Sequence, residues 1–226
     1  AIKGTFPAIF MDVNAGIVTQ ADALKLASIE QWGSNPWANM YGAFAGCGNM
    51  VYNATDVPDL SQVTHMGSMF SGAEAFNGDL SGWDVSNVTD MSSMFNDAVA
   101  FEGIGLSGWD VSSVTDMSYM FTYNIAFNGN ISDWDVSNVT NMSYMFADAA
   151  AFNRDLGAWN IGSVTYMTDM LSYSGLSPNN YGATLQGWAT QVQNNNGPSN
   201  IMLGAESVNY CNTQLTQNEQ FWMDHH

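Results

Sequence analysis

The stretch Leu80-Ser-Gly-Trp-Asp-Val-Ser-Asn-Val-Thr-Asp-Met-Ser-Ser-Met-Phe95 decides the fold, because close copies of it recur along the chain. The later copies lie at 106–121, 131–146 and 156–171, and two degenerate copies lie earlier, at 29–44 and 57–70. The closing residues of the six copies are 26, 25, 26, 25 and 25 positions apart: Phe44, Phe70, Phe95, Phe121, Phe146 and Leu171. A period this steady is typical of a repeat protein whose units stack on one another.

Each unit is expected to contain one short strand and one short helix. Residues 101–106 match the strand part of a leucine-rich repeat, with apolar side chains at the first, fourth and sixth positions. Residues 88–95 place apolar side chains at helical spacing, and Asn87 just before them resembles an N-cap. The sequence therefore predicts an α/β, leucine-rich-repeat-like solenoid of about six units of 25–26 residues, each with a short parallel strand and a short helix, between end caps.

The expected domain organisation is a single repeat domain over residues 1–226. It divides into an N-terminal cap at 1–27, a six-repeat solenoid at 28–171, and a C-terminal helical cap and tail at 172–226. The pair Ser177-Pro178 marks the start of the cap helix, because Ser is favoured at the N-cap and Pro at the first helical position. Two columns of like residues are expected in the core: Trp83, Trp109, Trp134 and Trp159, and Val88, Val114, Val139 and Val164.

The repeat resembles the BspA-type leucine-rich-like surface proteins, whose signature is W-D-V-S-N-V-T-x-M-S-x-M-F. Residues 83–95 match that signature fully, residues 109–121 and 134–146 match it with one or two changes, and residues 159–171 depart more. The resemblance implies a secreted or surface-attached protein of bacteria or some protists, with a role in adhesion or matrix binding. The motif residues of that family are structural, so the resemblance implies no catalytic residue.

The charge balance excludes several classes of partner. Only three residues are basic against 21 acidic ones, which gives a formal net charge of −18. Such a chain is repelled by nucleic acid and by anionic membranes. No apolar run approaches the ~20 residues that span a bilayer, so no membrane insertion is expected. Charged residues make up 11% of the chain against about 25% in typical domains, and a neutral polar surface of this kind is common in secreted proteins.

An extracellular or cell-surface location is the expectation that follows. The chain begins at Ala1 with no visible signal peptide, and we interpret it as a mature or trimmed segment. Cys47 belongs to the first unit and Cys211 lies beyond the last, so no intramolecular disulfide is expected.

The sequence predicts no enzyme and no cofactor. His65 is the one histidine inside the repeat array, no nucleophile motif is present, and no glycine-rich phosphate loop precedes a helix. Carboxylates recur in columns rather than converging on a cleft. We expect those columns to serve the fold.

Calcium between neighbouring units is the open alternative for these carboxylates. The favoured interpretation is that each one accepts hydrogen bonds from the backbone of its own corner, because no D-x-D-x-D-G arrangement is present. The two columns are Asp84, Asp110 and Asp135, and Asp79, Asn130 and Asp155.

Two functions from different classes remain open. The first is non-catalytic adhesion to a surface protein or glycan, with Tyr119, Tyr123 and Tyr144 available to stack on sugars. The alternative is ice binding through a flat face of hydroxyls and methyls. The residues of that candidate face form two columns: Thr64, Thr89, Thr115, Thr140 and Thr165, and Ser61, Ser86, Ser112 and Ser137. Helix-capping is the competing explanation of both columns.

Overall fold

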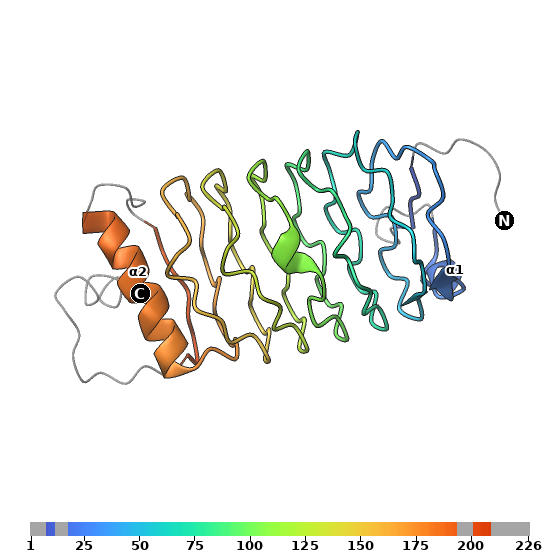
Figure 1. Ribbon diagram of the computed structural model, residues 1–226. Helices are drawn as coiled ribbons and strands as arrows, with labels where there is room; N and C mark the ends of the chain where they lie inside the picture. The colour runs from blue at the N-terminus through green and yellow to red at the C-terminus, as the bar shows by residue number, and fades with distance from the viewer. Residues whose placement is uncertain (1–7, 12–17, 194–200, 209–226) are drawn as a thin grey trace.

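The computed structural model describes residues 8–11, 18–193 and 201–208. Figure 1 shows a chain wound into successive coils stacked along one axis, with a short helix near one end and a long helix at the other. The elements of this described part are helix α1 (Gln20–Ala23), strands β1 (Ser28–Ile29) and β2 (Val51–Tyr52), the 3-10 helix η2 (Leu106–Gly108) and helix α2 (Pro178–Gln193). The two strands pair in parallel, with Ser28 opposite Val51 and Ile29 opposite Tyr52.

The predicted fold class is wrong in its elements. The described residues contain two α-helices and one two-stranded parallel sheet, and the repeats themselves are turns and irregular backbone rather than strand-plus-helix units. Residues 88–95, where a helix was expected, are not helical, and the Asn87 side chain donates to the Ser61 carbonyl of the preceding coil instead of capping. The expected strands at the coil starts are also absent from 76–80 and 101–105.

The hydrogen bonds of residues 91–98 explain why no helix forms there. The N–H groups of Met91, Ser93, Phe95 and Asp97 donate to carbonyls of the next coil, at 2.8–3.0 Å. The N–H groups of Met94, Asn96 and Ala98 close turns onto the carbonyl three residues back, as Met94 does on Met91 at 3.2 Å, and that of Ser92 donates to the Asp90 side chain. An α-helix needs every N–H to bond four residues back, so alternate donation to the neighbouring coil excludes it.

Left-handed backbone recurs at two positions in every coil and interrupts any extended run. The first column, with φ between 50° and 59°, comprises Gly42, Ser68, Ser93, Tyr119, Tyr144 and Asp169. The second column, with φ between 56° and 76°, comprises Gly46, Gly72, Asp97, Tyr123, Asp148 and Tyr173. From His65 onward, parallel pairing between coils is consequently one residue wide, at the bridges that join His65, Asp90, Asp116, Asn141 and Tyr166 in series.

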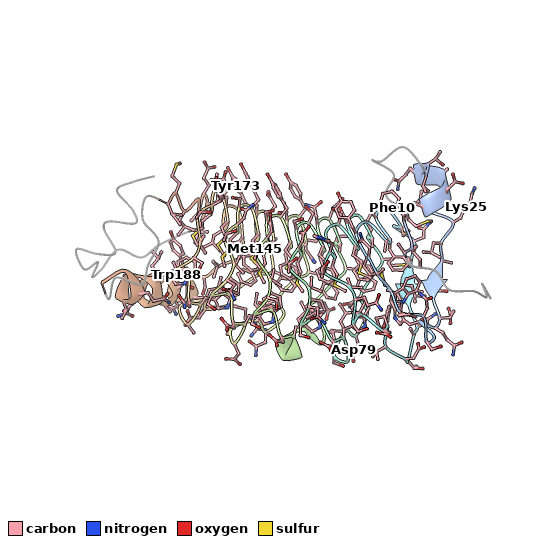
Figure 2. All side chains as sticks on the ribbon, turned by 90° about the horizontal axis from the view of Figure 1, so that it is seen from above. Phe10, Lys25, Asp79, Met145, Tyr173 and Trp188 are labelled. Carbon is pink, nitrogen blue, oxygen red and sulfur yellow. The ribbon has the colours of Figure 1, made fainter. Side chains whose placement is uncertain are left out.

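The core lies inside the stack and uses the columns that the repeat predicts. Both expected columns are buried, with the tryptophans at 1–5% and the valines at 0–3% exposure. The rings of Trp134 and Trp159 stack at 6.5 Å, and those of Phe95 and Phe121 at 5.6 Å. Met145 lies between the two edges of the stack marked by Tyr173 and Asp79 (Figure 2). The aromatic and methionine side chains therefore form one continuous apolar interior.

Helix α2 covers one end of the stack, and it begins where Ser177-Pro178 indicates. The Asn180 N–H bonds the Ser177 hydroxyl at 3.3 Å, which is N-cap geometry. The buried Trp188 indole donates to the Leu156 carbonyl at 3.0 Å. Residues 201–208 continue the ladder, since Leu171 and Tyr173 donate to the carbonyls of Gly204 and Glu206. The predicted residue bounds of the two caps and of the solenoid stay predictions.

Candidate functional site

The threonine column is a ladder of hydrogen bonds between coils. The hydroxyl of each threonine from Thr89 onward donates to the carbonyl of the preceding threonine, at 3.0–3.1 Å. The backbone N–H groups of the same residues reach the same carbonyls at 2.8–2.9 Å. The hydroxyl hydrogens are thus used within the fold, while four of the five residues remain exposed: Thr64, Thr115, Thr140 and Thr165.

The serine column belongs to aspartate-capped corners. The hydroxyls of Ser61, Ser86 and Ser112 each donate to the carboxylate two residues before, at 2.6 Å. The backbone N–H of Ser86 reaches the same Asp84 oxygen at 3.1 Å, and Ser137 reaches Asp135 likewise. These bonds, the serine hydroxyl first and the backbone N–H second, lower the pKa values of the carboxyls that accept them: Asp59, Asp84, Asp110 and Asp135.

The second column, of two aspartates and one asparagine, has the same local role. Asp79, Asn130 and Asp155 accept from the backbone N–H two residues on, at 2.9, 3.3 and 2.8 Å. Within the described ranges, no group of three or more His, Cys, Asp or Glu side chains is placed to hold a metal ion. Both columns therefore have the own-corner hydrogen bonding that the sequence favoured, and calcium stays an untested alternative.

His65 is exposed and Cys47 is buried. His65 is more than half exposed, and its Nδ1 lies 3.6 Å from a carboxylate oxygen of Asp90. Cys47 is fully buried, and burial raises the pKa of its thiol to about 11, so the reactive thiolate is disfavoured. Cys211 lies outside the described residues, so the predicted absence of a disulfide has no structural test.

A hollow of about 430 Å³ lies on the surface of the last three coils. We name it the tyrosine hollow. Its wall includes Tyr119, Tyr123, Tyr144 and Tyr173, with Asp148, Asp169 and Glu206. The rings of Tyr119 and Tyr144 stack at 4.8 Å with an angle of 10° between their planes. Figure 2 shows Tyr173 at one edge of the stack, opposite the edge that carries Asp79.

The charged side chains that line the tyrosine hollow are all acidic. The negative charge of Asp169 and its hydrogen bond to the Tyr144 hydroxyl raise the pKa of that tyrosine. The Tyr173 hydroxyl donates to Glu206 at 2.6 Å, and this bond followed by the glutamate's charge raises the pKa of Tyr173. Both hydroxyls therefore stay protonated through the physiological range. The wall contains aromatic faces and carboxylates but no basic side chain among the described residues.

Sequence reasoning found part of this site. Tyr119, Tyr123 and Tyr144 were expected to be exposed stacking residues, and the structure brings them together with Tyr173. It missed Tyr173, Asp148, Asp169 and Glu206. Alignment of the repeats would have found the first three, because Asp169 is in register with Tyr119 and Tyr144, and Asp148 and Tyr173 are in register with Tyr123. Glu206 reaches the hollow only through the return of 201–208 along the last coil. Neither predicted column, of threonines or of serines, lines it.

Comparison with known proteins gives one family. The model described as "Mycoplasma protein of unknown function, DUF285" matches residues 15–105, 38–130 and 102–210, which together extend over most of the chain. No curated protein matches. No solved structure matches. In the described part of the chain, no helix has the length and apolar character needed to span a bilayer.

Proposed function

We propose, starting from the fact that this chain belongs to the DUF285 family, that it is a non-catalytic binding module at the outside of a cell. It presents the surface of a rigid coil stack to a protein or glycan partner. The observation that carries this proposal is the tyrosine hollow, where four aromatic side chains that the core does not use gather at one place. The BspA-type resemblance and the low share of charged residues, 11% of the chain, support the extracellular setting.

Backbone geometry strengthens the assignment. All four tyrosines have φ between 56° and 59°, a region that bulky residues rarely occupy and that costs about 1–3 kcal/mol for each. The equivalent positions of the first two coils carry Gly42, Ser68, Gly46 and Gly72. Since the fold itself accepts small residues there, the tyrosines are explained by what they present to a ligand.

The test is binding of the purified chain to arrays of glycans and extracellular-matrix proteins. The variant Tyr119→Ser/Tyr144→Ser restores the residue type of earlier coils and should lose at least tenfold in affinity. Tyr166→Ser is the matched control, because Tyr166 is 64% exposed and lies outside the hollow. Retention of full binding by the double variant would rule out the hollow as the contact surface.

Ice binding is the second candidate, and the specific observation that favours it is the threonine ladder. Its five residues recur at one place in consecutive coils, and hydrogen bonds of nearly equal length join them. The exposed methyls and acceptor lone pairs could order water, although the hydroxyl hydrogens point to neighbouring carbonyls.

Thermal hysteresis and inhibition of ice recrystallisation test this candidate. The variant Thr115→Tyr interrupts the ladder's evenness at its centre and should abolish activity. Ile125→Tyr places the same bulk at an exposed position of the same coil and should leave activity intact. An inactive parent protein removes ice binding from consideration.

A further inference from the structure

We propose that the tyrosine hollow binds a guanidinium group, and that the partner is a protein that inserts an arginine side chain there. The inference deepens the binding function proposed above and rests on it. The residues that line the hollow indicate the chemistry of the ligand. They include the rings of Tyr119, Tyr123 and Tyr173, and the carboxylates of Asp148 and Asp169.

Negative charge in the hollow is left without a compensating cation among the described residues. Asp148, Asp169 and Glu206 lie in one wall, and no Lys or Arg accompanies them. The two basic residues in the described part of the chain have partners elsewhere, since Lys25 pairs with Asp22 at 2.6 Å and Arg154 donates to the Asn128 carbonyl at 2.7 Å. A cationic ligand relieves repulsion among the carboxylates, whereas a neutral sugar leaves it unchanged.

The tyrosine rings of the hollow favour a guanidinium over an ammonium. Tyr123 and Tyr173 are 54% and 51% exposed, so their rings are open to a ligand. Tyr119, which stacks on Tyr144, is itself 41% exposed. A guanidinium is planar, stacks on tyrosine rings and bonds carboxylates through two parallel N–H groups, while an ammonium acts as a point charge. The combination favours arginine over lysine.

A protein partner fits the setting better than a zwitterionic lipid. The chain's net charge of −18 attracts basic protein surfaces and speeds their encounter. A choline head group carries a phosphate that the three carboxylates would repel. The hollow of about 430 Å³ exceeds one guanidinium, which leaves room for the side chain's stem and for neighbouring backbone.

The test is a titration of the full chain, labelled with ¹³C at the tyrosine rings, followed by NMR. The probes are acetyl-Gly-Arg-Gly-amide, its lysine equivalent, its citrulline equivalent as the neutral isostere, and methyl β-glucoside. We expect saturable ring shifts with the arginine peptide, at least tenfold weaker binding of the citrulline peptide, and lysine between them.

Paired variants separate local recognition from net charge. Asp148→Asn/Asp169→Asn should weaken the arginine peptide about tenfold, and asparagine is well accepted at left-handed φ, so the backbone should hold. Glu102→Gln/Asp133→Asn removes the same charge outside the hollow and should change affinity less than twofold.

Three results would overturn the inference. Equal binding of the arginine and citrulline peptides would show ring stacking without charge recognition. Equal weakening by the two variant pairs would show long-range attraction only. Ring shifts with the glucoside and none with arginine would make the hollow a sugar site, and the binding function proposed above would then stand without its arginine partner.

Discussion

At the residue scale, side-chain donors that reach across coils satisfy the polar atoms of the buried tryptophans. The indole N–H groups of Trp109, Trp134, Trp159 and Trp188 donate to carbonyls 28–32 residues earlier, at 2.9–3.1 Å. Each ring thus packs in the core while its one polar atom is satisfied, which is the condition for burying tryptophan without penalty.

Trp134→Phe should lower the free energy of unfolding by about 1–3 kcal/mol, because it removes the bond to the Leu106 carbonyl and leaves a smaller ring in a packed column. Urea denaturation monitored by circular dichroism measures the change. Met142→Leu, a swap of similar volume in the same coil, should cost less than about 1.5 kcal/mol. Equal effects of the two would refute the role of the indole N–H.

Acid stability depends on the aspartate corners. The pKa values of Asp84, Asp110 and Asp135 are lowered in the folded chain, so their stabilisation is present above the ordinary value of 3.8 and is lost as the pH falls below it through the folded values. Asparagine keeps the turn acceptor, as Asn160 does for the Gly162 N–H at 3.1 Å.

The variant Asp84→Asn/Asp110→Asn/Asp135→Asn should therefore lose less stability than the parent between about pH 4 and pH 2. Urea midpoints across that window provide the measurement. Glu74→Gln/Glu102→Gln/Asp133→Asn makes the same change in net charge at exposed carboxyls outside these corners. A control that flattens the pH profile as much as the corner variant would assign the effect to general charge repulsion.

At the element scale, helix α2 seals the open end of the stack by very close approach. A Cβ at Gly187 would lie 2.2 Å from the Gly157 carbonyl oxygen, and one at Gly157 would lie 2.7 Å from the Ala183 carbonyl oxygen. The glycine in the helix is therefore required by packing, although glycine is a poor helix former.

Gly187→Ala should destabilise the protein, against the gain of about 1 kcal/mol that helix propensity alone would give. The methyl forces α2 away from the last coil and uncovers Trp188 and Leu185, both fully buried in the parent. Hydrogen exchange should show faster exchange in α2 and in 159–171. Gln186→Ala, on the exposed side, is the control that should leave exchange unchanged.

At the scale of the whole molecule, each coil contacts mainly its two neighbours. The stack should therefore tolerate a change in the number of coils but not a shift in the register between them. The N–H of Met117 donates to the Asn141 carbonyl, and that of Met142 donates to the Tyr166 carbonyl in the same way. Removing one full coil would bring Met117 and Tyr166 into an equivalent pairing.

Deletion of residues 134–158 should give a folded chain that is less stable and whose tyrosine hollow is shortened by the loss of Tyr144 and Asp148. Deletion of 134–145, about half a coil, should prevent cooperative folding, because every later column would face the wrong side. Thermal unfolding and small-angle scattering distinguish the two. A folded half-coil deletion would refute column register as the determinant of the stack.

The amino-acid sequence by itself determined the period, the buried tryptophan and valine columns and the start of α2 at Pro178, because these depend on which side chains recur and on local capping chemistry. It did not determine the backbone. Apolar spacing at 88–95 suits a helix, yet alternate N–H groups there bond to carbonyls of the next coil, partners that no local pattern specifies.

The tyrosine hollow was decided by tertiary structure for the same reason. Its wall joins residues from Asn96 to Glu206, and only the stacking of coils brings them together. Which side chains are buried follows from the repeating pattern of apolar residues along the chain. Which groups bond to each other, and which residues are neighbours on the surface, depends on how successive coils align. Tyr119 and Tyr173 both have left-handed φ, and only the stacked coils bring them to one place on the surface.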